Sequence, residues 1–130
     1  MPIRVCMAGA TGWAGSELAR GIAATEDLTL VAAVSRTYAG CSLGEVLGEP
    51  RLTCPVYASV MEALANRCDV FVEYTKPESA KGNILAALER GAHVVVGTSG
   101  LTDSDFAAID EVARKAERMI IHRLRRLRRF

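Results

Sequence analysis

Residues 5–15 read Val5-Cys6-Met7-Ala8-Gly9-Ala10-Thr11-Gly12-Trp13-Ala14-Gly15, with three glycines at GxxGxxG spacing. An apolar, strand-like run precedes the glycines, and a helical pattern over residues 13–24 follows them. In such a turn Gly9 permits a sharp change of direction, Gly12 leaves space beside the backbone, and Gly15 lets the helix lie close to the strand. The pattern therefore predicts a β-turn-α unit at the start of the fold.

From this unit onward, short β-branched runs alternate with helical stretches, which is typical of βαβ units in a parallel sheet. Most of the runs are apolar almost throughout, as expected for strands that are buried on both faces. The expected strands cover residues 3–8, 28–34, 56–57, 70–74, 93–96 and 119–121. We therefore predict an α/β fold over residues 1–121: a Rossmann-type, doubly wound parallel sheet in a single domain, with helices on both sides.

Capping signals mark several helix ends. Ser59 followed by Glu62 predicts a capping box, and Thr102 predicts the cap of a later helix. Pro77 suits a first helical position, and Gly91 suits a left-handed C-terminal cap. The helices expected from these signals and from apolar spacing cover residues 13–24, 43–47, 61–66 and 78–90, with a further helix beginning after Thr102.

The glycine loop favours a dinucleotide as ligand, because amides at the start of the following helix and the positive end of its dipole can face a pyrophosphate. Tight strand-to-helix turns without a ligand also use glycine, but here the glycines lie between a strand and a helix, as the motif requires. The loop residues that we expect to contact the cofactor are Gly9, Ala10, Thr11, Gly12, Trp13, Ala14 and Gly15.

The end of the second expected strand indicates which cofactor is bound. An acidic residue there binds the ribose of NAD, whereas a basic residue accommodates the 2′-phosphate of NADP. This chain has Ser35 and Arg36 at that place. A guanidinium binds phosphate through paired hydrogen bonds, and a serine does not repel it. We therefore predict that NADPH is preferred over NADH, against the alternative that Arg36 is a solvated loop charge.

Two later strand ends add candidate residues, since ligands of open α/β folds gather at the carboxyl ends of the strands. Hydroxyl and amide groups there can face a nicotinamide or its ribose. Lys76 can neutralise a phosphate or a substrate carboxylate, with a solvated lysine as the alternative. These candidates are Tyr74, Thr75 and Lys76 after the fourth strand and Gly97, Thr98 and Ser99 after the fifth.

Composition narrows the class of protein. The four cysteines have no CxxC spacing, so we predict neither a metal site nor a redox dithiol. No apolar run approaches the roughly 20 residues that cross a bilayer. No secretory signal opens the chain. We therefore expect a cytoplasmic protein without a membrane segment.

Basic charge is concentrated at the C-terminus. The net charge is +1, but residues 122–130 contain five of the sixteen Lys and Arg residues and no acid. Leu124 and Leu127 fit one face of a helix among these arginines, as in segments that bind nucleic acid or anionic membranes. We favour the alternative that residues 122–130 are a non-native or disordered tail left by truncation or a change of reading frame, because charge runs are usually solvated. We therefore expect no nucleic-acid partner.

Three separated segments resemble one enzyme family, the 4-hydroxy-tetrahydrodipicolinate reductases, also called dihydrodipicolinate reductases. They are the glycine loop, residues 69–78 and residues 95–101, and the family reads close to D-V-x-I-D-F-T-x-P-E and V-I-G-T-T-G-F in the last two. The resemblance implies the cofactor domain of a reductase that delivers hydride from NADPH or NADH to a cyclic, imine-like dicarboxylate in diaminopimelate and lysine biosynthesis. It implies cofactor contacts at residues 9–14, 35–36 and 97–99.

The chain also departs from the pattern of this family. The family often has Arg-Met where this chain has Trp13-Ala14, and often an acid where Ser35 stands, which further favours NADPH. The family continues with an Asn-Phe-Ser loop and a substrate domain with a His-His-x-x-Lys motif, which have no counterpart here. We therefore expect the substrate domain to be absent and identify no catalytic residue. We expect little or no turnover, and binding of the dicarboxylate only if a substrate domain is supplied.

Two further hypotheses stay open. The glycine loop with Ser35-Arg36 also resembles the start of N-acetyl-glutamyl-phosphate reductase, an NADPH enzyme with a catalytic cysteine, although no cysteine here lies in that family's catalytic context. The other hypothesis is a non-catalytic module that binds a nucleotide or coenzyme A. The sequence predicts no oligomeric state.

Overall fold

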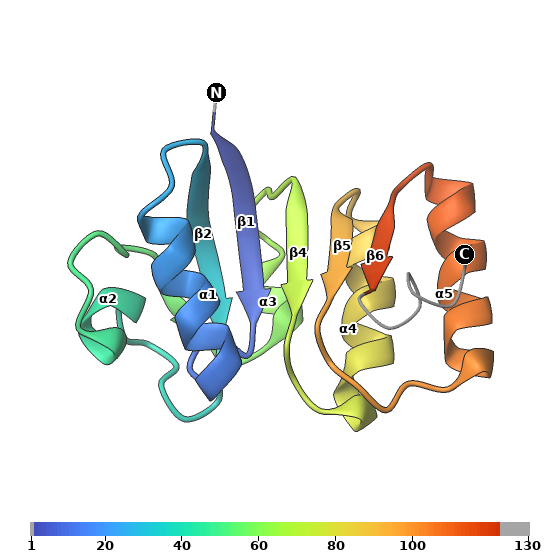
Figure 1. Cartoon of the computed structure of the whole chain (residues 1–130), viewed down its shortest axis with the longest axis horizontal. Helices are drawn as coiled ribbons and strands as arrows, with labels where there is room; N and C mark the ends of the chain where they lie inside the picture. Colours follow the sequence, from blue (N-terminus) through green and yellow to red (C-terminus); the bar gives the residue numbers. More distant parts are fainter. Residues whose placement is uncertain (1, 123–130) are drawn as a thin grey trace.

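The computed structural model describes residues 2–122 as a six-stranded sheet in which every pair of neighbouring strands is parallel. The strand order is β3-β2-β1-β4-β5-β6, which is the order of the doubly wound dinucleotide-binding folds. The strands are β1 Ile3–Ala8, β2 Leu28–Val34, β3 Val56–Tyr57, β4 Val70–Glu73, β5 His93–Val96 and β6 Ile120–His122 (Figure 1). The predicted fold class is confirmed, with single-residue differences at the bounds of β4 and β6. The predicted non-native or disordered tail covers residues 122–130: its first residue, His122, instead ends β6, and residues 123–130 lie outside the described residues.

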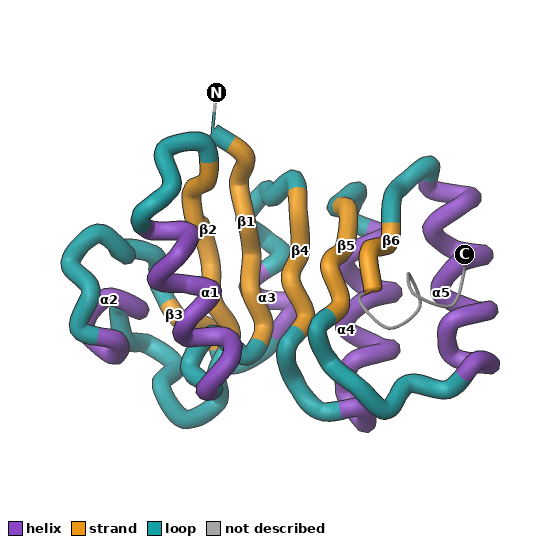
Figure 2. The backbone as a smooth tube through the Cα atoms, viewed as in Figure 1, coloured by secondary structure: helices purple, strands orange, loops and turns teal. Residues whose placement is uncertain are grey.

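Helices lie on both faces of the sheet, as predicted. In Figures 1 and 2, α1 lies in front of the sheet, while α4 lies behind it. Within residues 2–122, no helix has the length and apolar character needed to cross a membrane. The helices are α1 Trp13–Ala23, α2 Leu43–Leu47, α3 Val60–Ala63, α4 Pro77–Glu89 and α5 Asp103–Ala116.

Each face of the sheet has its own apolar core. Along β1 the side chains alternate between the two cores, because successive residues of a strand point to opposite faces. Cys6 and Ala8 pack with residues of α3, α4 and α5, whereas Val5 and Met7 pack with residues of α1 and α2. A fully buried side chain such as Met7 contributes about 1.5–3 kcal/mol. The packing on both faces fixes the places from which the loops leave the sheet.

Most of the predicted helix caps are present. Thr102 Oγ1 accepts a hydrogen bond from Asp105 N, and the Asp105 carboxylate accepts one from Thr102 N, both at 3.0 Å. Gly91 follows α4 with a left-handed φ of 88°. The capping box predicted at Ser59 is half formed, which corrects that expectation. Ser59 Oγ accepts from Glu62 N at 3.2 Å, but the Glu62 carboxylate binds the Ser59 hydroxyl and not its amide.

Helix α3 is shorter than the predicted span of residues 61–66. After Leu64 the amides donate three residues back, with Asn66 N bonded to Ala63 O at 3.1 Å. Asn66 Nδ2 donates to the same carbonyl at 3.1 Å and to the Tyr57 hydroxyl at 3.0 Å. These contacts favour a tight turn over a further helical turn, and the tie to Tyr57 depends on tertiary structure.

An ion pair joins the amino ends of β1 and β4. Arg4 Nη2 lies 3.0 Å from Asp69 Oδ1, and the Arg4 amide donates to Asp69 Oδ2 at 2.8 Å. The hydrogen bonds from the Arg4 side chain, followed by that from its amide, lower the pKa of Asp69 to about 2. This pair therefore favours the β1–β4 register at the edge of the sheet opposite to the strands' carboxyl ends.

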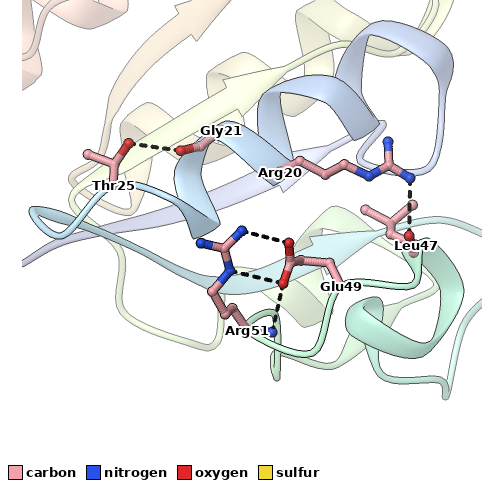
Figure 3. A network of polar contacts seen from close by, with 6 residues as sticks. All are labelled: Arg20, Gly21, Thr25, Leu47, Glu49 and Arg51. Carbon is pink, nitrogen blue, oxygen red and sulfur yellow. Dashed lines mark hydrogen bonds and ion pairs between the residues drawn. The ribbon is translucent and has the colours of Figure 1, made fainter.

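The connection between β2 and β3 is tied to α1 (Figure 3). Arg20 of α1 donates from Nη2 to the Leu47 carbonyl at the end of α2, at 3.1 Å. Beyond α2, Arg51 holds both carboxylate oxygens of Glu49, at 2.8 and 3.0 Å. The Arg51 side chain lowers the pKa of Glu49 to about 2. The Arg20–Leu47 bond ties the segment that follows Ser35 to the helix that follows the glycine loop, and the Arg51–Glu49 pair orders the segment itself.

Candidate functional site

The carboxyl ends of β1, β2, β4 and β5 meet at one edge of the sheet, the lower edge in Figure 1. Ala8, the last residue of β1, pairs with Val34 of β2 on one side and with Glu73 of β4 on the other. Glu73 in turn pairs with Val96 of β5. The register therefore brings together the four segments that carry all the residues predicted for the site.

The three glycines of the loop are in different environments. Gly9 has φ +87°, and a β-carbon there would collide with the Tyr74 carbonyl; a β-carbon on Gly15 would collide with the Gly9 carbonyl. Gly12 has φ −75°, and the nearest atom to a β-carbon there would be Gly9 O at 3.4 Å, which is ordinary contact. Packing within the protein therefore requires Gly9 and Gly15 to be glycine, but does not require it of Gly12.

Helix α1 begins directly after Gly12 and presents its amino end at this edge. Ser16 N donates to Gly12 O at 2.8 Å, which is the first bond of the helix. The preceding amides, from Trp13 to Gly15, have no acceptor within the helix. The N-cap Gly12 supplies no side-chain acceptor, and the first turn has no acidic residue. The positive end of the helix dipole thus remains available for an anion.

Residues of the glycine loop and of the β2 end are in contact, as the predicted site requires. Thr11 Oγ1 donates to Ser35 Oγ at 3.2 Å, and Ser35 is half-buried. Arg36 is exposed beside it. Ala10, by contrast, is fully buried. Its side chain packs in the core, so only its backbone can contribute to the loop's binding surface. This part of the site combines small polar groups with an exposed guanidinium.

Trp13 stands at the first position of α1 with 89% of its surface exposed. It is the only tryptophan of the chain. Large aromatic side chains bury much apolar surface when they can, so an exposed indole beside Gly12 is a surface on which a flat ring or a sugar can pack. Because the chain has no other tryptophan, the fluorescence of Trp13 reports on this edge of the sheet.

The buried carboxylate of Glu73 is a feature that the sequence analysis missed. Glu73 ends β4 and is 0% exposed. It accepts hydrogen bonds from Thr75 N at 2.7 Å, from Thr75 Oγ1, from Asn83 Nδ2 of α4 at 3.0 Å and from Thr98 Oγ1 at 3.4 Å. Burial raises the pKa of Glu73, against the opposing effect of these donors. The available signal was an acidic residue that ends an otherwise apolar strand.

Thr98 has a different orientation from the one we expected. Its side chain is buried, and its hydroxyl donates to the Thr75 carbonyl at 3.0 Å and contacts Glu73. This hydroxyl therefore orders the loop from within, while Ser99 and Lys76 are exposed. Tyr74 is half-buried with its ring against Gly97, where a β-carbon would overlap the ring. The loops after β4 and β5 thus pack against each other.

Within residues 2–122, no group of three or more His, Cys, Asp or Glu side chains lies close enough to hold a metal ion. Cys6 is fully buried in β1, and the nearby Cys68 thiol together with burial raises its pKa. It packs as a small core residue.

The strand order, the glycine loop and the converging loops define a Rossmann-type domain of the class that binds nicotinamide dinucleotides. Residues 3–123 match the family described as "Dihydrodipicolinate reductase, N-terminus". The chain belongs to this family. The match decides between the two enzyme families that the sequence resembles, in favour of the first.

Individual relatives agree with this membership. A 4-hydroxy-tetrahydrodipicolinate reductase of Bacillus cereus is 34% identical over 114 residues, which are 87% of this chain and 43% of that protein. The chain therefore spans less than half the length of this curated relative. Similarity therefore shows that the chain belongs to this family of reductases. It does not show that the chain has the activity of the full-length relative.

Solved structures share the fold. A dipicolinate-bound dihydrodipicolinate reductase from Paenisporosarcina sp. TG-14 superposes with a TM-score of 0.77 at 24% identity, covering 94% of this chain and 47% of that one. Biliverdin reductase from Synechocystis sp. PCC 6803, in complex with biliverdin and NADP+, gives 0.77 at 20% identity, covering 94% and 38%. At these identities the likeness shows the fold.

Proposed function

We propose that this chain binds NADPH as the cofactor-binding part of a reductase that acts on 4-hydroxy-tetrahydrodipicolinate in diaminopimelate and lysine biosynthesis. Family membership supports the reaction class. The observation that carries the binding role is the environment of Gly12, because nothing in the protein's own packing requires a glycine there.

The space at Gly12 fits a pyrophosphate. A β-carbon at this exposed residue would make only an ordinary contact with Gly9 O, next to the amides at the start of α1 that have no acceptor within the helix. A phosphate needs such an approach to backbone amides, and a glycine permits it. The absence of an acidic side chain in the first turn of α1 agrees with an anionic ligand.

The β2 end supports NADPH over NADH. Ser35 is neutral and is bonded to Thr11 of the glycine loop at 3.2 Å, so no carboxylate stands where the 2′-phosphate of the adenosine ribose would lie. Arg36 is exposed and free to turn toward this phosphate. A guanidinium–phosphate pair is a charge-assisted, paired hydrogen bond, which discriminates between the two cofactors.

The loops after β4 and β5 would receive the nicotinamide end of the cofactor, which supplies a hydride when bound. Gly97 and Ser99 present exposed backbone, Tyr74 and Thr75 form the half-buried wall, and Lys76 stands exposed at the start of α4. We further propose that these 130 residues bind the cofactor with little or no turnover. Binding of the dicarboxylate and its protonation would then need groups from the part of the relatives that this chain does not span.

Ligand titration tests the proposal. Trp13 is the only tryptophan and is exposed beside Gly12, so its fluorescence should change when NADPH binds, with energy transfer to the reduced nicotinamide. We expect the affinities to fall in the order NADPH, NADH, coenzyme A. Tighter binding of coenzyme A would replace the reductase proposal with the non-catalytic module, and absence of binding by NADPH and NADH alike would contradict the cofactor role.

A further inference from the structure

We propose that Glu73 is a positioning residue of the dinucleotide site, whose carboxylate holds the loops after β4 and β5 in the arrangement that receives the nicotinamide end. The inference rests on the proposed function. It concerns a side chain that touches no ligand itself and acts through Thr75 and Thr98.

The carboxylate of Glu73 connects three elements. From its own loop it accepts the Thr75 amide at 2.7 Å and the Thr75 hydroxyl; from α4 it accepts Asn83 Nδ2 at 3.0 Å; from the loop after β5 it accepts Thr98 Oγ1 at 3.4 Å. The Glu73 carbonyl accepts two further bonds from that loop, from Gly97 N at 2.8 Å and Thr98 N at 3.2 Å. One residue therefore ties both loops to each other and to α4.

A carboxylate suits this place better than any other side chain of its size. Two of the groups around it, Thr75 N and Asn83 Nδ2, can only donate, and an ionised carboxylate only accepts. A glutamine would bring an amide donor against the donors of Thr75 or Asn83, so part of the network would break. The surrounding hydrogen bonds also make the buried charge tolerable, because charge-assisted bonds are stronger than neutral ones.

The cost of burial indicates a role beyond stability. Buried ionic groups are often no more stabilising than apolar residues of the same volume. Glu73 is fully buried at the end of an apolar strand, and burial raises its pKa. A hydrophobic residue would fill this place in the core without the cost of burying a charge. It would, however, remove the hydrogen bonds by which the carboxylate joins the two loops.

The position of Glu73 in the sheet limits its effect to one half of the site. The adenosine half lies between β1 and β2, where Thr11 contacts Ser35. Glu73 ends β4, on the other side of β1. Loss of the carboxylate should therefore disturb the nicotinamide half and leave the adenosine half intact.

The experiment compares two ligands on the full 130-residue chain by calorimetric titration: NADPH, and adenosine 2′,5′-bisphosphate, which lacks the nicotinamide half. For Glu73→Gln we expect the Kd for NADPH to rise about tenfold, the effect of losing one charged hydrogen bond. We expect the Kd for adenosine 2′,5′-bisphosphate to change by less than about twofold, because additivity holds for separated sites.

Asp69→Asn is the matched control. It makes the same acid-to-amide change at the opposite end of β4, where Asp69 is bonded to Arg4, and should leave both affinities unchanged. Asn83→Ala removes one donor from the carboxylate and should weaken NADPH selectively, by about threefold. It keeps the test decisive if Glu73→Gln does not fold.

The outcomes separate the two proposals. Selective weakening of NADPH by Glu73→Gln or by Asn83→Ala supports the positioning role. Equal weakening of both ligands means a general loss of structure and overturns the inference. Unchanged NADPH affinity in Glu73→Gln also overturns it, as does unchanged NADPH affinity in Asn83→Ala where Glu73→Gln does not fold. If the unsubstituted chain binds adenosine 2′,5′-bisphosphate and NADPH, the proposed function stands whatever Glu73 does; if it binds neither, both proposals fall.

Discussion

The ring of Tyr74 lies directly against Gly97, so that a β-carbon on Gly97 would overlap the ring atoms. The two residues directly follow the neighbouring strands β4 and β5, and their contact closes the wall of the proposed nicotinamide half. A methyl group at Gly97 would force the ring to move.

Gly97→Ala should therefore destabilise the fold by about 1–3 kcal/mol, the usual cost of overpacking. In a Tyr74→Ala background the same change should cost much less, because the ring is gone. Urea unfolding of the two single variants and the double variant measures this coupling. Additive effects would mean that the ring and Gly97 do not restrict each other.

Gly12→Ala should abolish most of the NADPH affinity while leaving the fold intact. The new methyl group meets no protein atom closer than 3.4 Å, so stability should change by less than about 1 kcal/mol. It would occupy the space proposed for the pyrophosphate. Titration with NADPH and thermal unfolding of the same sample give the two quantities.

Two other glycines serve as references for Gly12. Gly21→Ala lies in the same helix with open space around it and should leave binding unchanged. Gly15→Ala would collide with the Gly9 carbonyl and should lower stability instead. Equal NADPH affinity in Gly12→Ala and Gly21→Ala chains would remove the main support for a dinucleotide at this loop.

Arg36→Ser should reduce the preference for NADPH over NADH. Loss of a charged hydrogen bond to the 2′-phosphate weakens NADPH about tenfold or more, and NADH has no such phosphate. Arg114→Ser removes the same charge from the exposed surface of α5 and should alter neither affinity. If the ratio of the Kd values for NADH and NADPH stays constant in Arg36→Ser, residues other than Arg36 discriminate between the two cofactors.

The Arg4–Asp69 pair should make stability depend on pH in a defined direction. Asp69 has its pKa lowered to about 2 in the folded protein, against about 3.9 in an unfolded chain. Its contribution is therefore fully present above about pH 4 and is lost as the pH falls toward about 2. The difference in unfolding free energy between the unsubstituted chain and Asp69→Asn should shrink over that range.

Arg4→Met provides the check on this assignment. The Arg4 guanidinium is the main cause of the lowered pKa of Asp69. Without it, the difference in unfolding free energy caused by Asp69→Asn should depend less on pH. Denaturant midpoints at about pH 6, 4 and 2.5 are enough to measure it. An unchanged slope in Arg4→Met would mean that another acid dominates.

Features that depend on neighbouring residues in the chain were predictable. The GxxGxxG loop, the apolar strands and the cap at Thr102 are local patterns, and the structure confirms β1, β2, β3 and β5 at the expected bounds. The convergence of four segments at one edge followed from the parallel sheet, since carboxyl ends of parallel strands meet there.

Features that depend on distant contacts were not predictable. Glu73 becomes the centre of a network only because Thr98, 25 residues later, and Asn83 of α4 come to lie beside it. The same distance hid the inward orientation of the Thr98 hydroxyl. Helix α3 ends early where Asn66 reaches Tyr57, a contact that no helical pattern contains.

The glycine loop separates two kinds of constraint along a few residues. Gly9 and Gly15 must be glycine because a β-carbon there would collide with the protein's own backbone, whereas Gly12, Trp13 and Arg36 are exposed. Mutations at the exposed positions therefore carry little penalty in stability. If the proposed function holds, the cofactor preference of this domain can be redesigned at these positions with little loss of stability and without compensating changes in the core.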